Sequence, residues 1–289
     1  MYTSSKKIFY FLKFDCLSPL KEIKGLIILV TIMFASCSGP KDLWVFERDI
    51  ELTDISPNGM TIIGDDIWVA DTDNNRLVVL DDKGNLKREL PEIERPMHIT
   101  QVNGKPLVSE YGSDVVSLIE ADKRDIIHLA ATPDAPASAD MVGNKIAVAD
   151  FYNHRIIVEV DGQEMHIGGK GNRDGEFHYP TDVQFLDGKL YVADAYNHRV
   201  QVFDDDGTHL RTLAEDQNIN AATGIFVTNE HIIVTDFEND RVLTFSQDGK
   251  LVDLMDEGFL RPTDVLIHED QLYVLNFKGK FISIFNSNK

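Results

Sequence analysis

One residue position recurs at a nearly constant spacing through most of this chain, and it constrains the fold more than any other feature. It closes a short stretch rich in β-branched and aromatic residues. The six copies are Asp71, Glu110, Asp150, Asp194, Asp236 and Asn276. Before each copy, at one fixed offset, stand Pro57, Pro96, Pro136, Pro180, Ala222 and Pro262. The period of roughly 40 residues means that the chain repeats one structural unit six times.

The best-formed repeat shows what the unit is. In residues 179–203, three segments (182–186, 189–193 and 199–203) read as short strands separated by turns, because apolar residues alternate or cluster with β-branched ones. Four strands per repeat, with almost no helical pattern, predict the blades of a β-propeller. The last repeat has only three strands, so we expect segment 43–52 to supply its outer strand and to close the ring. The predicted fold is therefore all-β, a six-bladed β-propeller of four-stranded blades.

Several motifs in these repeats are similar to a known family. They are Pro-x-Asp-Val, Tyr-Val-Ala-Asp, Asn-His-Arg-Val-Gln-Val-Phe and the connector at residues 168–180. They resemble NHL repeats over roughly residues 43–287, most clearly in the third and fourth copies and least in the second. The resemblance implies a six-bladed propeller. It does not imply one activity, because the family includes binding modules, a metal-dependent amidating lyase and relatives of lactonases.

The first 36 residues have the features of an export signal. Lys21 and Lys24 precede an apolar run at 25–35, which is too short to span a bilayer but suits the core of a signal peptide. Small residues then lead to Cys37, which resembles a bacterial lipobox. We expect a lipoprotein-type signal peptide at 1–36, lipid on Cys37, a tether at 37–42 and the propeller at 43–289. The predicted location is the bacterial cell envelope, at the outer membrane or the periplasmic face, with the lipid as the only membrane contact.

Charge and cysteine content exclude several functions. The net charge is −20, and residues 1–36 hold five Lys and two acidic residues, so the remainder carries about −23. Such a surface repels phosphate backbones, so we expect no nucleic-acid partner. The only other cysteine, Cys16, lies in the leader, which rules out disulfides and cysteine-based zinc sites in the propeller. We expect a monomer.

Propeller geometry predicts which face carries the function. The Pro-x-Asp corners, the Asn-His-Arg turns and the blade connectors share one face, which also carries aromatic residues at Tyr111, Tyr152, Tyr196, Phe237 and Phe277. The opposite face holds tight Asp-Gly hairpins, which are structural devices. We therefore expect a protein, peptide or glycan partner on the first face.

A second candidate site is a ring at the channel mouth, two residues after each proline position. Its members are Gly59, His98, Ser138, Asp182, Gly224 and Asp264. Three roles are open for it: hydrogen bonding within the fold, binding of a polar ligand, or a metal site in which His98, Asp182 and Asp264 hold a hard cation such as Ca²⁺. One histidine at this offset is too few for a zinc lyase, and nothing in the sequence aligns Ser138, His98 and Asp182 as a catalytic triad.

The repeated Asp and Arg, five residues apart, are interpreted as supports of each blade, and so are His154 and His198 in the same turns. The sequence thus favours a non-enzymatic binding propeller without a required cofactor. The alternative is a Ca²⁺-dependent, lactonase-like hydrolase or lyase that uses the central channel.

Overall fold

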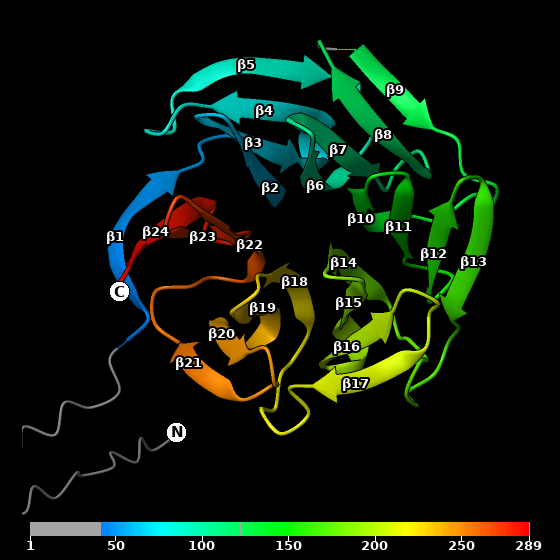
Figure 1. The fold of residues 1–289 in the computed structure, drawn as a ribbon. Coiled ribbons are helices and arrows are strands. Elements are labelled where there is room, and N and C mark those ends of the chain that lie inside the picture. Colours follow the sequence, from blue (N-terminus) through cyan, green and yellow to red (C-terminus); the bar gives the residue numbers. More distant parts are fainter. Residues whose placement is uncertain (1–41, 122, 289) are drawn as a thin grey trace, which may run out of the picture. The chain divides into compact units, whose positions relative to one another are not determined.

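The computed structural model describes residues 42–121 and 123–288. The predicted signal peptide, Cys37 and all of the tether except Asp42 lie outside these residues. The described chain forms six four-stranded antiparallel sheets around a central axis, as Figure 1 shows. The predicted six-bladed, all-β propeller is therefore confirmed.

In the first five repeats, four consecutive strands form one blade, ordered from the axis outward. Blade 1 consists of β2 (Pro57–Ile63), β3 (Asp66–Asp71), β4 (Arg76–Leu80) and β5 (Leu86–Pro91). Blade 2 consists of β6 (Pro96–Val102), β7 (Lys105–Glu110), β8 (Val115–Glu120) and β9 (Lys123–Ile127). Blade 3 consists of β10 (Pro136–Val142), β11 (Lys145–Asp150), β12 (Arg155–Val160) and β13 (Gln163–Gly168).

The second half of the ring follows the same plan. Blade 4 consists of β14 (Pro180–Leu186), β15 (Lys189–Asp194), β16 (Arg199–Asp204) and β17 (His209–Leu213). Blade 5 consists of β18 (Ala222–Val227), β19 (His231–Asp236), β20 (Arg241–Ser246) and β21 (Leu251–Met255). Blade 6 contains β22 (Pro262–His268), β23 (Gln271–Asn276) and β24 (Phe281–Ser287).

The N-terminal strand closes the ring as the sequence predicts. Strand β1 (Trp44–Glu51) pairs antiparallel with β24, from Trp44 opposite Ser287 to Glu51 opposite Phe281. It thus becomes the outer strand of blade 6, and Figure 1 shows the two ends of the propeller side by side. Pairing the first strand with the last blade removes an unpaired edge and ties the ends of the ring together.

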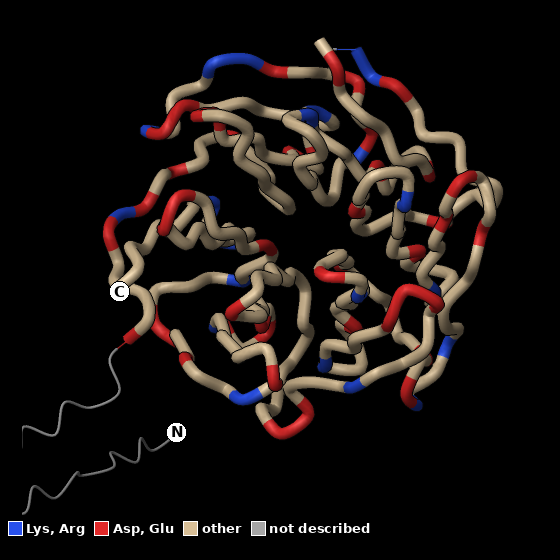
Figure 2. The backbone as a smooth tube through the Cα atoms, in the orientation of Figure 1, with Lys and Arg blue, Asp and Glu red and all other residues tan. Residues whose placement is uncertain are grey.

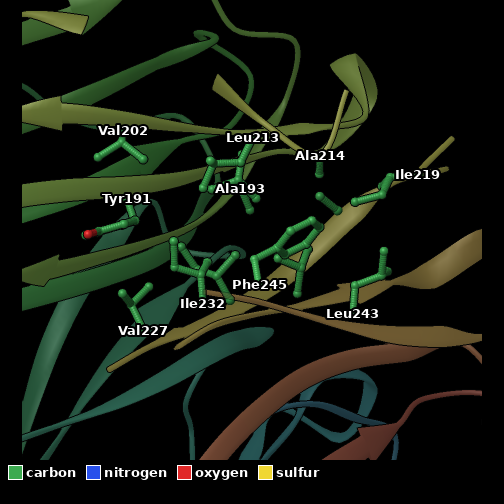
Figure 3. Packing of buried hydrophobic residues seen from close by; sticks show 14 residues of the cluster. Tyr191, Ala193, Val202, Leu213, Ala214, Ile219, Val227, Ile232, Leu243 and Phe245 are labelled. Carbon is green, nitrogen blue, oxygen red and sulfur yellow. The ribbon is translucent and has the colours of Figure 1, made fainter. Parts of the chain in front are cut away.

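The core consists of apolar clusters between neighbouring blades. The cluster between blades 4 and 5, shown in Figure 3, joins Tyr191 and Val202 of one blade to Ile232 and Phe245 of the next. Equivalent clusters lie at the other five junctions of the described chain. Middle strands such as β15, in which five of six residues are buried, therefore pack on both faces. This explains their continuous apolar sequences.

Two faces result, and they differ in the length of their loops. The loop face carries the turns at 72–75, 111–114, 151–154, 195–198, 237–240 and 277–280, together with the blade-to-blade connectors. Three of these turns contain short 3₁₀ helices, η1 (Thr72–Asn74), η2 (Ala195–Asn197) and η3 (Phe237–Asn239). The hairpin face carries the tight turns that join the first strand to the second and the third strand to the fourth. Acidic residues lie in loops all around the ring in Figure 2, and no helix among the described residues is long and apolar enough to cross a membrane.

Candidate functional site

A buried acid organises the loop-face turn in five of the six blades, and blade 6 has the buried amide Asn276 at this position. In blade 4, Asp194 is fully buried, pairs with the Arg199 Nε at 2.9 Å, and accepts hydrogen bonds from the Asn197 side chain and from the His178 backbone N–H at 2.8 Å. The same arrangement recurs in blades 1, 3 and 5, where the acid–arginine distance is 2.6 Å. The repeated Asp–Arg pair is therefore a support of blades 1, 3, 4 and 5.

Blade 2 keeps this support by a different route. Its acid, Glu110, has no arginine five residues later. Arg124 on the outer strand β9 reaches in instead and places its Nε 2.6 Å and its second guanidinium nitrogen 2.8 Å from the two carboxylate oxygens. The longer Glu side chain and a donor from the fourth strand thus replace the local pair, which the repeat pattern alone did not predict.

The residue that ends each turn has a second structural role. Asn75, Asp114, His154, His198 and Asp240 all adopt positive φ, and each accepts the backbone N–H of the residue that precedes the next inner strand. The acceptor is Oδ1 in Asn and Asp and Nδ1 in His, so three residue types are interchangeable here because they offer an acceptor at the same place. Asn, Asp and His are also the residues that best tolerate positive φ.

This contact fixes the tautomer of both turn histidines. The His154 Nδ1 accepts from the Tyr179 N–H at 3.0 Å and the His198 Nδ1 from the Ala221 N–H at 3.1 Å, so each ring is neutral and carries its proton on Nε2. Burial, with Lys170 and His178 nearby, lowers the pKa of His154. These hydrogen bonds confirm that both histidines support the turn in which they lie.

The channel ring comes together at the axis. The His98 Nε2 lies 3.7 Å from Asp182 Oδ1 and 3.5 Å from Asp264 Oδ1. Ser138 donates to Asp182 Oδ1 at 2.7 Å, and its hydroxyl lies 3.2 Å from His98 Nδ1. Among the described residues, His98, Asp182 and Asp264 are the one group of potential metal ligands whose ligand atoms lie within 4.8 Å of one another.

Both carboxylates also join neighbouring blades. Asp182 Oδ2 accepts the Ile225 N–H of blade 5 at 2.8 Å, and Asp264 Oδ2 accepts the Met60 N–H of blade 1 at 2.7 Å, across the seam where the ring closes. Asp140, one step deeper on β10, accepts the Phe185 N–H of blade 4 at 2.7 Å. Asp140 was not predicted, although the same offset in the repeat carries Gln184, which bonds Val227 in the same way.

The ring glycines allow the inner strands to approach each other closely. A Cβ at Gly59 would lie 2.6 Å from the His98 Cα, and one at Gly224 would lie 2.5 Å from the Thr263 carbonyl oxygen. Any larger residue at these two positions would push neighbouring blades apart. They contribute to the site by bringing His98 and Asp264 close to the axis.

The electrostatics of this group are dominated by its acids. Burial alone would lower the pKa of His98, but Asp182 and Asp264 outweigh that effect and raise it to about 9. Burial raises the pKa of Asp182 to about 6, with Asp264 adding to the rise and His98 opposing it. At neutral pH His98 is thus an imidazolium beside Asp182 and Asp264.

This arrangement fits Ca²⁺ poorly. Calcium takes six to eight oxygen ligands in proteins, whereas this group offers two carboxylates and one imidazole. Each carboxylate oxygen already accepts a backbone N–H. The observed contacts describe an internal ion pair that ties blades 2, 4 and 6 together.

His98 also forms part of a cavity on the loop face. This axial cavity has a volume of about 410 Å³, and residues of all six blades line it. Phe151, Tyr196 and Phe237 supply aromatic walls, and His198 and Glu238 lie at the side. A second cavity of about 360 Å³ continues along the channel and is lined by His98, Asp140, Asp182 and Asp264. His98 is thus shared by the two.

The five predicted loop-face aromatics have different environments. Tyr196 and Phe237 line the axial cavity, whereas Tyr111, Tyr152 and Phe277 do not. Tyr152, Tyr196 and Phe277 are exposed, but Tyr111 and Phe237 are half-buried, because Arg95 and Arg261 cover their rings.

Sequence reasoning missed other residues of this surface. Phe151 and Tyr179 link Tyr111, Tyr152 and Tyr196 into one group of touching rings, with centroids 4.7 Å apart between Phe151 and Tyr179 and 5.1 Å between Tyr179 and Tyr196. A signal existed for Phe151, because the residue after the repeated acid is also aromatic at Tyr111, Phe237 and Phe277. His198 was interpreted only as a turn residue, yet it also lines the axial cavity.

Comparison with known proteins agrees with this architecture. The family model of the NHL repeat matches residues 177–203, which run from the end of the connector to Phe203 in the third strand of blade 4. No curated protein matches the sequence.

Solved structures of other propellers are similar in fold. A streptogramin B lyase structure is 16% identical with a TM-score of 0.64, covering 84% of this chain and 87% of that one. A catalytically inactive virginiamycin B lyase from Staphylococcus aureus, solved with quinupristin, is 16% identical with a TM-score of 0.63 over 83% and 85% of the two chains. The WD40 β-propeller domain of Doa1 is 11% identical with a TM-score of 0.65 over 85% and 98%.

At such identities the likeness concerns the fold alone, and these proteins differ in function by their own descriptions. The repeats, the closed ring of blades and the matched segment agree with one another. The chain is therefore a six-bladed β-propeller that carries an NHL repeat in its fourth blade.

Proposed function

We propose that this protein is a non-enzymatic binding propeller whose loop face takes a protein, peptide or glycan partner in and around the axial cavity. The observation that carries the proposal is the cavity itself. It is concave, about 410 Å³, walled by aromatic rings and lined by a few polar groups, which is the usual character of a ligand site. The exposed aromatics beside it extend the contact surface.

The pairing of the ionisable groups supports binding over chemistry. The side chains at the channel mouth that resemble a catalytic set, His98, Asp182 and Asp264, are engaged in an ion pair and in bonds between blades. A general base needs a free lone pair within reach of its substrate. The raised pKa of His98 keeps that lone pair protonated at neutral pH.

We propose a lipid on Cys37 as the anchor at the bacterial envelope. Trp44 pairs with Ser287, and Ser287 donates its N–H to the Asp270 carbonyl in the β22–β23 hairpin, so β1 begins on the hairpin face.

A hydrolase or lyase that uses the channel is the second candidate. It is supported by the place of His98, which lines both cavities beside two carboxylates, and by the lyases among the similar folds. A bound Ca²⁺ belongs to this candidate.

One set of measurements separates the two. Metal content of the purified protein is determined, and its thermal unfolding is followed in EDTA and in added Ca²⁺. The binding hypothesis predicts that the protein contains no stoichiometric metal and that its midpoint of thermal unfolding is the same in EDTA and in added Ca²⁺. A stoichiometric ion that disappears in the Asp264→Ala variant would support the enzyme, and lactones and esters would then be assayed with His98→Gln as the inactive control.

The anchor is tested separately. Cells grown with a radiolabelled fatty acid should label the full-length protein, and Cys37→Ser should abolish the label and release the protein from the membrane fraction. Labelling that persists in the variant would refute the lipid attachment at Cys37.

A further inference from the structure

The axial cavity contains no unpaired charge among the described residues that line it. Glu238 forms an ion pair with Arg261, whose guanidinium also stacks on Phe237. His98 is held between Asp182 and Asp264. A charged ligand would find no free counter-charge here and would lose hydration on entry, which is costly for an unpaired ion.

The cavity does offer neutral hydrogen-bonding groups of both kinds. His198 is exposed, and because its Nδ1 accepts the Ala221 N–H, its Nε2 carries a proton and is a donor. The Asn220 amide is exposed at the wall. The Asn58 amide, which also lines the cavity, donates to the Met97 sulfur at 3.1 Å. This sulfur is a weak acceptor that a better one can replace.

The remaining walls are aromatic. Phe151, Tyr196 and Phe237 come from the same turn of three consecutive blades and line the cavity, whereas Asn58 and Met97 come from blades 1 and 2. A ligand that fits this arrangement has an apolar face to lie on rings and a polar edge that both donates and accepts. A sugar ring has these two properties, with C–H groups on its faces and hydroxyl groups around its edge.

We infer that the axial cavity recognises an uncharged sugar unit of a glycan, with Tyr196 and Phe237 stacking on the ring and His198 donating to a hydroxyl. This inference rests on the proposed binding function and narrows its partner to one class. The volume of about 410 Å³ lies low in the range of roughly 300–1,000 Å³ for small-molecule sites. It suits a terminal mono- or disaccharide unit.

The test measures saccharide binding to the full-length protein by saturation-transfer NMR and calorimetry. The probes are N-acetylglucosamine, N,N′-diacetylchitobiose, cellobiose and maltose, with glucuronic acid and glucosamine as charged counterparts. We expect at least one neutral sugar to bind and its charged counterparts to bind more weakly.

Two variants locate the contact. Tyr196→Ala removes a ring that is 56% exposed, so folding should be kept while binding weakens roughly tenfold, as for a central aromatic contact. His198→Asn keeps an acceptor for the Ala221 N–H but loses the Nε2 donor, and should weaken binding several-fold. Phe46→Ala, which removes an equally exposed ring from the outer strand β1, is the matched control and should bind as the wild type does.

The outcomes separate this inference from the proposed function. Stronger binding of the charged sugars, or neutral-sugar binding that neither variant weakens, overturns the sugar assignment. Binding of members of a peptide library that requires Tyr196, with none of the sugars bound, also overturns it but leaves the binding function standing. If neither sugars nor peptides bind at the cavity, both proposals fail.

Discussion

The His98 ion pair predicts a specific loss of stability in mild alkali. His98 titrates with a pKa of about 9 in the folded protein, against 6.5 for the free side chain. The folded state therefore holds this proton more tightly than the unfolded chain does. The resulting stabilisation is complete below pH 6.5 and disappears as the pH rises through about 9.

The magnitude follows from the size of the shift. Each pKa unit corresponds to about 1.4 kcal/mol, and integration of the linkage relation between pH 7 and pH 9.5 gives a loss of about 2 kcal/mol in the free energy of unfolding. The His98 side chain is only 17% exposed, so solvent screens this interaction little. Asp182 adds nothing to this window, because its raised pKa of about 6 places its own loss at lower pH.

The assay is urea unfolding of the wild type and the His98→Gln variant at several pH values between 7 and 9.5, at constant ionic strength. The wild type should lose about 2 kcal/mol over the range. The variant should start less stable at pH 7 and change little, since it lacks the titrating group. The difference between the two curves cancels contributions from other groups.

Parallel curves for the two proteins would refute the reasoning, because the pH dependence would then come from elsewhere. A wild type that gains stability with rising pH would also refute it, since that would require His98 to be neutral in the folded state. Asp264→Asn serves as a check on the cause. It removes one of the two charges that face His98, so the midpoint of the loss should move to lower pH.

Three further predictions concern the blade supports, each measured by urea unfolding at pH 7. Asp194→Ala should cost about 3–5 kcal/mol, because it leaves the buried Arg199 guanidinium without its carboxylate, and a cost under about 1 kcal/mol would show that the pair is not a support. His154→Asn should stay within about 0.5 kcal/mol of the wild type, because it keeps an acceptor for the next blade, whereas His154→Leu should lose about 1–2 kcal/mol; equal costs for the two would contradict the shared acceptor. Gly59→Ala should cost about 2 kcal/mol or more, since its Cβ would lie 2.6 Å from the His98 Cα, and an unchanged stability would mean that the inner strands can separate.

The architecture of this protein follows from its sequence because the repeat encodes it locally. Each unit carries its own alternating strands, its turn residues and its proline corner, so one well-formed copy at 179–203 predicts the others. The missing fourth strand of the last unit and the spare segment at 43–52 together predict the closure that β1 and β24 form. Residues that recur in several blades could also be assigned to support, since Asp194 and its counterparts make the same contacts each time.

The sites could be predicted only in part, because they consist of residues from different blades. The position two residues after each proline predicted that His98, Ser138, Asp182 and Asp264 belong to one ring. The distances between their side chains depend on how closely the inner strands approach. The state of His98 depends on two carboxylates that belong to other blades and lie far away in the sequence. The sequence of a single repeat therefore does not show the electrostatic effect of these two carboxylates on His98.

The sequence by itself thus determined the number of blades, the strands in each, the closure of the ring and the face on which the long loops lie, since these depend on short-range hydrophobic periodicity and turn chemistry. Only the tertiary structure decided that Arg124 replaces the missing arginine of blade 2, that Arg95 and Arg261 cover two of the aromatics, and that Phe151, Tyr196 and Phe237 enclose one cavity with His198. The physical reason is the same in each case. These contacts join side chains that become neighbours only when the blades close into a ring, so their energies depend on distances that no single repeat contains.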